Sequence, residues 1–485
     1  MPNLHAPEFP PDLPWLNVSS PLSLEQLTGK VVILDFWTYG CINCMHVLPD
    51  LKKLERKYGS ILTVIGVHSP KFTNEQNLAN LAGILKRYDI HHPVIQDVHL
   101  RLWQEYGIHS WPTLVIIDPA GYIAGSVSGE GHFTLLDSMV ANLLEKHAQF
   151  LDSSPLPLME AIEEDSLLRY PGKIASKGSM IGISDSGHHR IIISDLEGNI
   201  LDTFGSGSPG NTSGIREFAE FNNPQGLFFD ENHLYVADTG NHLIRRIELS
   251  NGRVETIAGN GGKQWHGPGR FGALTIGLNS PWDVAVDGYS LFIAMAGSHQ
   301  IWQMDLYHHI LTKIAGSGHE DLRDGNSEEA AFSQPSGLAI NRGILYVADA
   351  EDSAIRRIDL DQDWVSTLIG QGLFDYGDID GPLSRAKIQH ALGIAAQGSR
   401  IYIADTYNNR IKSLELLTGT IESIVGTGEP GCGNGIATQS SLREPGGLAV
   451  VFDGLMIADT GNHRILHYDS LNASVEELNL VGRPI

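Results

Sequence analysis

One short segment recurs six times in the second part of the chain. Three of its copies read LYVADTGNHLIRRI, LYVADAEDSAIRRI and LMIADTGNHRILHY. The copies follow one another at intervals of 53 to 57 residues, and they begin at Ile181, Leu234, Leu291, Leu345, Ile401 and Leu455. A period of this length, filled with short alternating strands, is typical of a β-propeller in which each repeat forms one blade.

Each repeat holds enough β-rich sequence for four strands. In the second copy they are NPQGLFF (223–229), LYVAD (234–238), IRRIEL (244–249) and VETIAG (254–259). Six such units predict a six-bladed propeller, whose closed ring removes exposed sheet edges. The first unit is divergent, because RYPGKIA (169–175) stands where the second has NPQGLFF. We therefore expect the C-terminal segment 474–480 to help closure by joining a blade near the start.

The repeated P-x-G-L…YVADT-x-N-H-R-I pattern resembles NHL repeats over nearly all of 165–485. Aspartates recur at one position, and histidines recur four residues later: Asp185, Asp238, Asp349, Asp405 and Asp459, with His189, His242, His299 and His463. A ring of such groups could hold a metal. However, an aspartate before a tight turn commonly accepts hydrogen bonds from backbone N–H groups, and residues repeated in every blade usually serve the blade. We interpret both series as structural.

Binding residues are expected where the repeats are interrupted. The crossings 259–277, 316–334 and 370–389 are long and variable, and long loops on a rigid scaffold commonly carry binding residues. Exposed candidates there are Trp265, His266, Asp378 and Asp380. Cys432 lies in the matching last crossing, and nothing near it in sequence predicts an activated thiol.

The first part of the chain carries the other two cysteines. The segment KVVILDFW (30–37) predicts a buried strand, and apolar residues recur at helical spacing from Cys41 to a helix end before Gly59. Further strands are expected at 61–67, 113–118 and 122–128, with helices at about 74–88, 98–106 and 132–149. This alternation predicts an α/β sandwich with a mixed sheet, in which Cys41 and Cys44 lie at a strand-to-helix junction.

This domain resembles the thioredoxin superfamily over about residues 20–150. The matching features are the Cys-Ile-Asn-Cys motif, Asp35 six residues before it, Pro49 eight residues after Cys41, and SWPT (110–113), whose Pro112 corresponds to a cis proline. Residues 75–97 resemble the extra helix and strand of the TlpA-like branch. The resemblance implies that Trp37, Trp111 and Pro112 shape a groove for a protein client.

Helix-end electrostatics and disulfide exchange suggest roles for three residues. At the first turn of a helix, free N–H groups and the helix dipole favour a thiolate, so Cys41 is the expected nucleophile and is expected to be open to solvent. Cys44 would attack the mixed disulfide and release the client. Asp35, if buried, would take the proton that Cys44 loses.

Other interpretations of these residues remain. The cysteines could be inert core residues, and Asp35 could be a hydrogen-bonded structural acid. A zinc site usually needs four ligands, and Cys432 is the only other cysteine, so we expect no metal and no cofactor at the pair.

Charge and hydropathy exclude some classes of partner. The formal net charge is -24, which argues against broad binding to nucleic acid or to anionic membranes. We find no secretory signal and no apolar run long enough to span a bilayer, and three cysteines cannot form a disulfide scaffold. These features predict a cytoplasmic protein.

The order of the two domains resembles the NHL repeat-containing protein 2-like family in its short bacterial form. We expect a thioredoxin-like α/β domain at 1–150, a linker at 151–166 and a six-bladed NHL-type propeller at 167–485. The leading hypothesis is a thiol-disulfide oxidoreductase that acts on a protein client, takes electrons from a thioredoxin-type system and uses the propeller as a binding platform. The alternatives are a non-catalytic scaffold with a vestigial or redox-sensing cysteine pair, and a metal-dependent enzyme built on the propeller channel.

Overall fold

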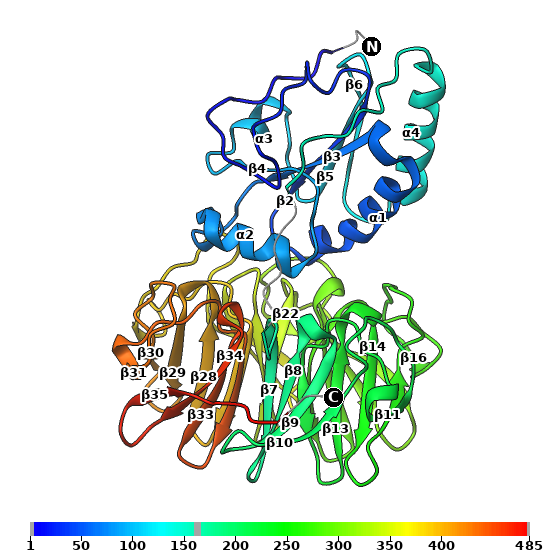
Figure 1. The fold of residues 1–485 in the computed structure, drawn as a ribbon. Helices are drawn as coiled ribbons and strands as arrows, with labels where there is room; N and C mark the ends of the chain where they lie inside the picture. The colour runs from blue at the N-terminus through cyan, green and yellow to red at the C-terminus, as the bar shows by residue number, and fades with distance from the viewer. Residues whose placement is uncertain (1–3, 160–165, 483–485) are drawn as a thin grey trace. The chain divides into compact units, whose positions relative to one another are not determined.

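Two units make up the chain in the computed structural model, Met1–Asp165 and Ser166–Ile485. The structure describes residues 4–159 and 166–482 (Figure 1). Residues 160–165 of the expected linker lie outside this part of the chain, while its earlier residues pack on the first unit. The Lys30 ammonium donates to the carbonyls of Asp152 and Ser154 at 3.0 and 2.6 Å, and Leu158 pairs with Val18.

The first unit is built on a six-stranded mixed sheet with the order β1-β4-β3-β2-β5-β6. The central strands β2, β3 and β4 are parallel, β5 runs antiparallel to β2, and β6 runs antiparallel to β5. All residues of β2 and β3 are buried, as the largely apolar sequence of β2 predicted for that strand. The strands are Trp15–Leu16 (β1), Val31–Trp37 (β2), Leu62–His68 (β3), Val94–Gln96 (β4), Thr113–Ile117 (β5) and Ile123–Ser128 (β6).

Helices cover both faces of this sheet (Figure 1). Helices α1 (Ile42–Tyr58) and α4 (Phe133–Lys146) pack on one face, and α3 (Arg101–Glu105) packs on the other with the N-terminal segment. Helix α2 (Leu78–Arg87) lies in the connection between β3 and β4 and begins at Asn77, whose side chain accepts from two amides of the first turn. This is the α/β arrangement that the alternating strands and helices predicted.

The second unit is a six-bladed β-propeller, as the six repeats predicted (Figure 1). Blade one has four strands: β7 (Pro171–Lys177), β8 (Met180–Asp185), β9 (Arg190–Asp195) and β10 (Ile200–Phe204). Blade two comprises β11 (Gly214–Ile215), β12 (Leu227–Phe229), β13 (His233–Asp238), β14 (Leu243–Glu248) and β15 (Arg253–Ala258). Blade three comprises β16 (Arg270–Gly272), β17 (Pro281–Asp287), β18 (Ser290–Met295), β19 (Gln300–Asp305) and β20 (Ile310–Ala315). Blade four comprises β21 (Gly325–Asn326), β22 (Pro335–Asn341), β23 (Ile344–Asp349), β24 (Ala354–Asp359) and β25 (Trp364–Ile369).

Blade five comprises β26 (Gly381–Pro382), β27 (Gly393–Gln397), β28 (Arg400–Asp405), β29 (Arg410–Glu415) and β30 (Thr420–Val425). Blade six comprises β31 (Gly435–Ile436), β32 (Gly447–Val451), β33 (Gly454–Asp459), β34 (Arg464–Asp469) and β35 (Ser474–Glu477). Blades two to six thus have five strands where four were expected. The extra strand is a short edge strand that comes from the long crossing before each blade, and it pairs with the outer strand of that blade.

The repeated aspartates and histidines serve the blades, as we interpreted them. Asp238 accepts a hydrogen bond from the backbone N–H of Asn222 at 2.8 Å, and Asp185, Asp349, Asp405 and Asp459 make the equivalent bond in their own blades. His242 accepts from the N–H of Ser280 at 3.2 Å and so ties its blade to the next one. The histidine series therefore forms the joints between blades.

Ring closure uses the same joint. His463 of blade six accepts from the N–H of Tyr170, which precedes β7, at 3.0 Å. The C-terminal segment contributes differently from our expectation, because Ser474–Glu477 stays in blade six as β35. Only the residues after it reach blade one, where the N–H of Ile200 donates to the carbonyl of Val481 at 2.9 Å.

Candidate redox site

Both cysteines of the pair lie where β2 leads into α1, and both are free thiols. Cys41 is the N-cap of α1, and its carbonyl accepts from the N–H of Cys44 at 3.1 Å. We expected Cys41 to be open to solvent, but this is wrong, because its relative exposure is only 5%. Cys44 is 1% exposed, so Cys41 remains the more accessible of the two.

Asp35 lies on β2 beneath the pair and is fully buried. Neither of its carboxyl oxygens has a hydrogen-bond partner among the described residues. Burial, assisted by the nearby Cys41, raises the pKa of Asp35 to about 8. The structure thus confirms the expected burial and provides a carboxyl that exchanges its proton near neutral pH.

Burial also raises the pKa of Cys44, and the adjacent Cys41 and Asp35 raise it further. One contact acts in the opposite direction, since the backbone N–H of Thr38 donates to the Cys44 sulfur and lowers this pKa. The carbonyl of Thr38 accepts from the N–H of Cys41 at 3.3 Å. Thr38 therefore contacts both cysteines through its backbone.

A second loop carries the residues expected in the client groove. The Trp111–Pro112 peptide bond is cis, as the resemblance implied. Trp111 is half-buried, its indole N–H donates to the carbonyl of Ser69 at 2.9 Å, and the Lys71 ammonium lies 5.0 Å from the centre of its ring. A partly open aromatic ring beside the cis bond suits contact with a peptide.

Trp37 has a different place from the other two groove residues. Its side chain is 1% exposed and packs edge-on against His68, with ring centroids 5.2 Å apart. The structure gives Trp37 a position in the core. Its contact with a client stays a prediction, and this burial argues against it.

Sequence reasoning missed two acidic residues near the pair. Glu75 is fully buried and accepts hydrogen bonds from Thr38 and Gly40, directly before Cys41. Glu130 forms an ion pair with His46, so the loop after β6 is joined to the first turns of α1. Glu75 is the first residue of the segment that resembles the TlpA-like branch, but no role was assigned to it, because an acid in a loop usually indicates a solvated side chain.

The candidate residues of the propeller loops are mostly engaged within the propeller. Asp378 and Asp380 lie 2.6 and 3.0 Å from the ammonium of Lys412, which is itself buried. His266 packs against Phe271 and Trp302, whereas Trp265 and Cys432 are exposed as expected. Within residues 4–159 and 166–482, no group of three or more His, Cys, Asp or Glu side chains is arranged to hold a metal.

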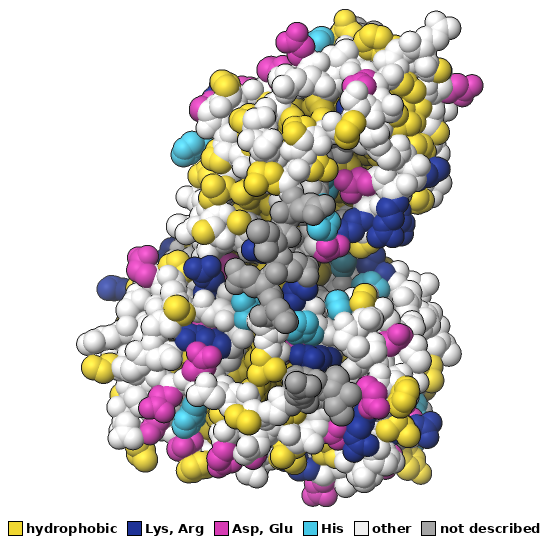
Figure 2. All heavy atoms as spheres, viewed as in Figure 1, with side chains coloured by type: hydrophobic (Ala, Val, Ile, Leu, Met, Phe, Trp, Pro, Cys, Tyr) yellow, Lys and Arg dark blue, Asp and Glu magenta, His cyan; other side chains and the backbone are white. Residues whose placement is uncertain are grey.

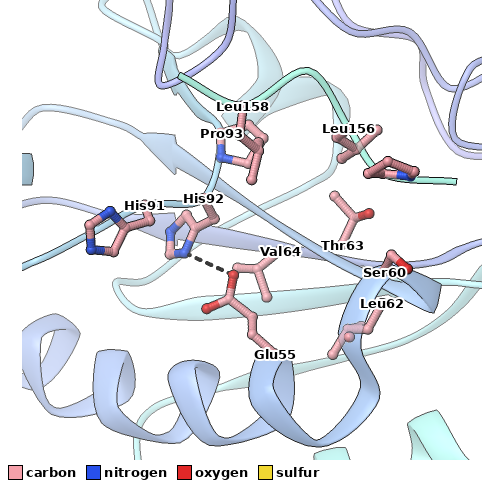
Figure 3. A pocket seen from close by; sticks show the side chains of 12 residues that line it. Glu55, Ser60, Leu62, Thr63, Val64, His91, His92, Pro93, Leu156 and Leu158 are labelled. Carbon is pink, nitrogen blue, oxygen red and sulfur yellow. Dashed lines mark ion pairs between the residues drawn. The ribbon is translucent and has the colours of Figure 1, made fainter. Parts of the chain in front are cut away.

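A cavity of about 300 Å³ lies elsewhere in the first unit. Its lining includes Leu62, Val64 and Leu156, with His92 and Glu55 forming an ion pair at 3.5 Å on one side (Figure 3). Glu55 belongs to the last turns of α1, whereas the cysteines lie at the first turn, about 20 Å away along the helix axis. The cavity is therefore separate from the redox site.

Comparison with known proteins supports both halves of this description. A thioredoxin-like family model matches residues 29–123, and an NHL repeat model matches residues 221–247. NHL repeat-containing protein 2 of Gallus gallus is 40% identical over 96% of this chain and 70% of its own length. The chain belongs to the NHL repeat-containing protein 2 family.

Other relatives differ in sequence identity to this chain and in the share of it that they match. Protein SUPPRESSOR OF QUENCHING 1, chloroplastic, of Arabidopsis thaliana is 43% identical over 96% of this chain, which spans only 46% of that protein. Thiol-disulfide oxidoreductase YkuV of Bacillus subtilis is 24% identical over 28% of this chain. The thioredoxin-like domain thus has thiol-disulfide oxidoreductases among its homologues.

Two of the predictions concern where the protein is located and whether it binds charged partners. Among its described residues, no helix combines the length and the apolar character needed to cross a membrane. On the face shown in Figure 2, Lys and Arg side chains lie in small groups among acidic ones. A cytoplasmic location stays a prediction, since one relative is named as chloroplastic.

Proposed function

We propose that the protein is a thiol-disulfide oxidoreductase whose propeller binds the protein client. The observation that carries this proposal is Asp35, a buried carboxyl with no hydrogen-bond partner in the part of the chain that the structure describes, beneath two free cysteines. A carboxyl that is costly to bury and unpaired is retained where its proton is used. Its pKa of about 8 suits proton exchange with a thiol at physiological pH.

The proposed reaction is a two-step exchange. The Cys41 thiolate, favoured at the N-terminus of α1, attacks a client disulfide, forms a mixed disulfide and releases one client thiolate. Cys44 passes its proton to the ionised form of Asp35 and attacks the Cys41 sulfur. This step releases the second client thiolate and forms the Cys41–Cys44 disulfide. Two electrons have then moved to the client, and a dithiol donor, for which we propose a thioredoxin-type system, restores the pair.

The low exposure of Cys41 favours a second candidate function. A sulfur that is only 5% exposed meets a large client with difficulty, so the protein would instead be a scaffold whose propeller recruits partners and whose pair senses redox state. The two functions differ in turnover. A sensor reacts once, whereas an oxidoreductase reduces many client disulfides when a dithiol donor is supplied.

The experiment measures reduction of a protein disulfide in the presence of a dithiol donor. We expect turnover by the wild type and by Cys432→Ser, the matched control at the exposed cysteine, and loss of turnover in Cys41→Ser. Cys44→Ser should accumulate a mixed disulfide through Cys41, which mass spectrometry of the trapped complex would identify. Equal turnover by the wild type and Cys41→Ser would refute the proposal.

A further inference from the structure

The carboxylate of Glu75 joins the loop after β3 to the loop before Cys41. Its Oε2 accepts from the hydroxyl of Thr38 at 2.6 Å, and its Oε1 accepts from the N–H of Gly40 at 2.9 Å. Within its own loop, Oε2 also accepts from the N–H groups of Lys71 and Phe72, at 2.6 and 3.1 Å. Four donors thus converge on one carboxylate that is 0% exposed.

These four donors favour the charged form of Glu75. Burial is the larger influence and raises the pKa of Glu75, whereas each of the four donors lowers it, and an ionised carboxylate can accept from every one of them. A buried carboxylate is costly unless it is fully hydrogen-bonded. The bonds to Thr38 and Gly40 therefore offset part of the cost of burying this carboxyl group.

Thr38 connects this carboxylate to the reacting sulfurs. Its hydroxyl is bound by Glu75, while its backbone N–H donates to the Cys44 sulfur and its carbonyl accepts from the N–H of Cys41. The N–H to sulfur bond is the one contact of Thr38 that favours the Cys44 thiolate. Its alignment depends on the loop that Glu75 fixes.

The same loop also reaches the cis-proline side of the site. The carbonyl of Ser69 accepts from the indole N–H of Trp111, and the Lys71 ammonium lies over the Trp111 ring. Glu75 and its loop thus contact the segments on both sides of the redox site.

We infer that Glu75 is a positioning residue of the redox site, which acts through Thr38 to set the rate at which Cys44 resolves a mixed disulfide. This inference rests on the proposed function. It adds a residue from outside the cysteine motif to the machinery, and it assigns that residue to the second step of the exchange.

The experiment follows the two steps separately with 5,5′-dithiobis(2-nitrobenzoate) in a Cys432→Ser background, which removes the exposed thiol. Attack by Cys41 cleaves the reagent's disulfide, releases one thionitrobenzoate and leaves the other bound to Cys41. Attack by Cys44 on the Cys41 sulfur releases the second thionitrobenzoate and forms the Cys41–Cys44 disulfide. The reagent takes two electrons from the dithiol, and stopped-flow absorbance resolves both releases.

We expect Glu75→Gln to slow the second release by roughly tenfold, the effect of losing one hydrogen bond to a charged group, and to change the first release much less. The NH2 group of the introduced amide would face either the N–H of Gly40 or the three donors that bind Oε2, and a donor cannot accept from them. Thr38→Val, which removes one donor and keeps the carboxylate, should slow the same step by a smaller factor. If Glu75→Gln does not fold, Thr38→Val alone tests the inference.

Two matched controls fix the comparison. Thr63→Val changes a second buried threonine, which lies on β3, and Glu105→Gln changes a solvent-exposed glutamate on α3. Both substitutions should leave the two releases unchanged. If Glu75→Gln or a folded Thr38→Val resolves at the wild-type rate, or if the first release slows as much as the second, the inference is overturned and the proposed function stands. If the parent with both cysteines releases no thionitrobenzoate, both fail together.

Discussion

The Nζ of Lys173 lies 3.5 Å from Oδ2 of Asp283, although the two residues belong to the inner strands of blades one and three. The same ammonium donates to the carbonyl of Ser336 in blade four at 2.9 Å and to that of Leu392 beside blade five. One side chain from blade one therefore reaches three blades around the ring axis. The divergent sequence of the first repeat supplies this lysine.

Glycine makes room for this contact. At the position of Lys173 and Asp283, the other inner strands carry Gly226, Gly337, Gly393 and Gly447. A Cβ atom at Gly447 would lie 2.7 Å from the Cα of Lys173, and one at Gly337 would lie 2.7 Å from the carbonyl oxygen of Leu392. The ammonium occupies the centre where a metal-dependent propeller enzyme would place its ion, which argues against that alternative.

Lys173→Met should destabilise the propeller by about 3–5 kcal/mol, because it leaves Asp283 as an uncompensated buried charge. Denaturant unfolding of the full chain measures the change. Lys177→Met, near the exposed end of the same strand, is the control and should cost less than about 1 kcal/mol. Adding Asp283→Asn to Lys173→Met should recover part of the loss, and a double variant less stable than the single one would contradict the pairing.

His463→Ala should weaken ring closure by about 1–3 kcal/mol, since it leaves the buried N–H of Tyr170 without its acceptor. His463→Asn should cost less, because Asn409 fills the equivalent place in blade five and its Oδ1 accepts from the N–H of Glu444 at 2.9 Å. Thermal unfolding of both variants gives the comparison. An equal loss in the two variants would show that the acceptor is not what matters.

Asp35→Asn should stabilise the first unit above acid pH. The folded state keeps the Asp35 proton up to about pH 8, whereas an unperturbed carboxyl loses it near pH 3.8, so stability falls as pH rises between these values. At pH 8 the raised pKa of Asp35 lowers the free energy of unfolding by about 5 kcal/mol. The asparagine side chain removes this cost, but as a buried amide without partners it introduces a cost of about 1–3 kcal/mol of its own. We expect a net gain of about 2–4 kcal/mol at pH 8 and a net loss of about 1–2 kcal/mol at pH 4, where ionisation of Asp35 costs little, measured by urea unfolding.

The same substitution should slow resolution by Cys44, because the carboxyl no longer takes its proton. The second release of thionitrobenzoate should be slower in Asp35→Asn by about 10- to 100-fold at pH 7, with a pH profile that has lost its inflection near pH 8. Asp50→Asn, on the outer side of α1, serves as the control. An inflection that persists in Asp35→Asn would assign the titration to another group.

Trp111→Ala should raise the KM for a protein disulfide by about tenfold and leave reduction of a small disulfide nearly unchanged, because the ring is half-buried beside the cis bond and supplies contact area. Steady-state kinetics with both substrates makes the comparison. Trp364→Ala, at a tryptophan of blade four that is 52% exposed, is the matched control. Equal loss with both substrates would mean that Trp111 supports the cysteines instead of the client.

Local patterns accounted for most of the fold. Each blade repeats the same strand and turn signals within about 55 residues, so its hairpins and the joint made by residues such as His242 follow from one short period. The strand that ends at Trp37 and the helix that begins at Ile42 are equally local, and they fix where Cys41 and Cys44 lie. Asp35 could be placed beneath the pair through the resemblance to thioredoxins, since it lies six residues before Cys41, where that superfamily keeps a buried acid.

The sequence by itself thus determined the two domains, the six blades and the cysteine pair above a buried acid. Only the tertiary structure decided that Cys41 is nearly covered, that Glu75 holds Thr38, and that Lys173 meets Asp283. The physical reason is distance along the chain: these contacts join residues 37 and 110 positions apart, so neither periodicity nor spacing encodes them, and they exist only after the strands and loops have packed.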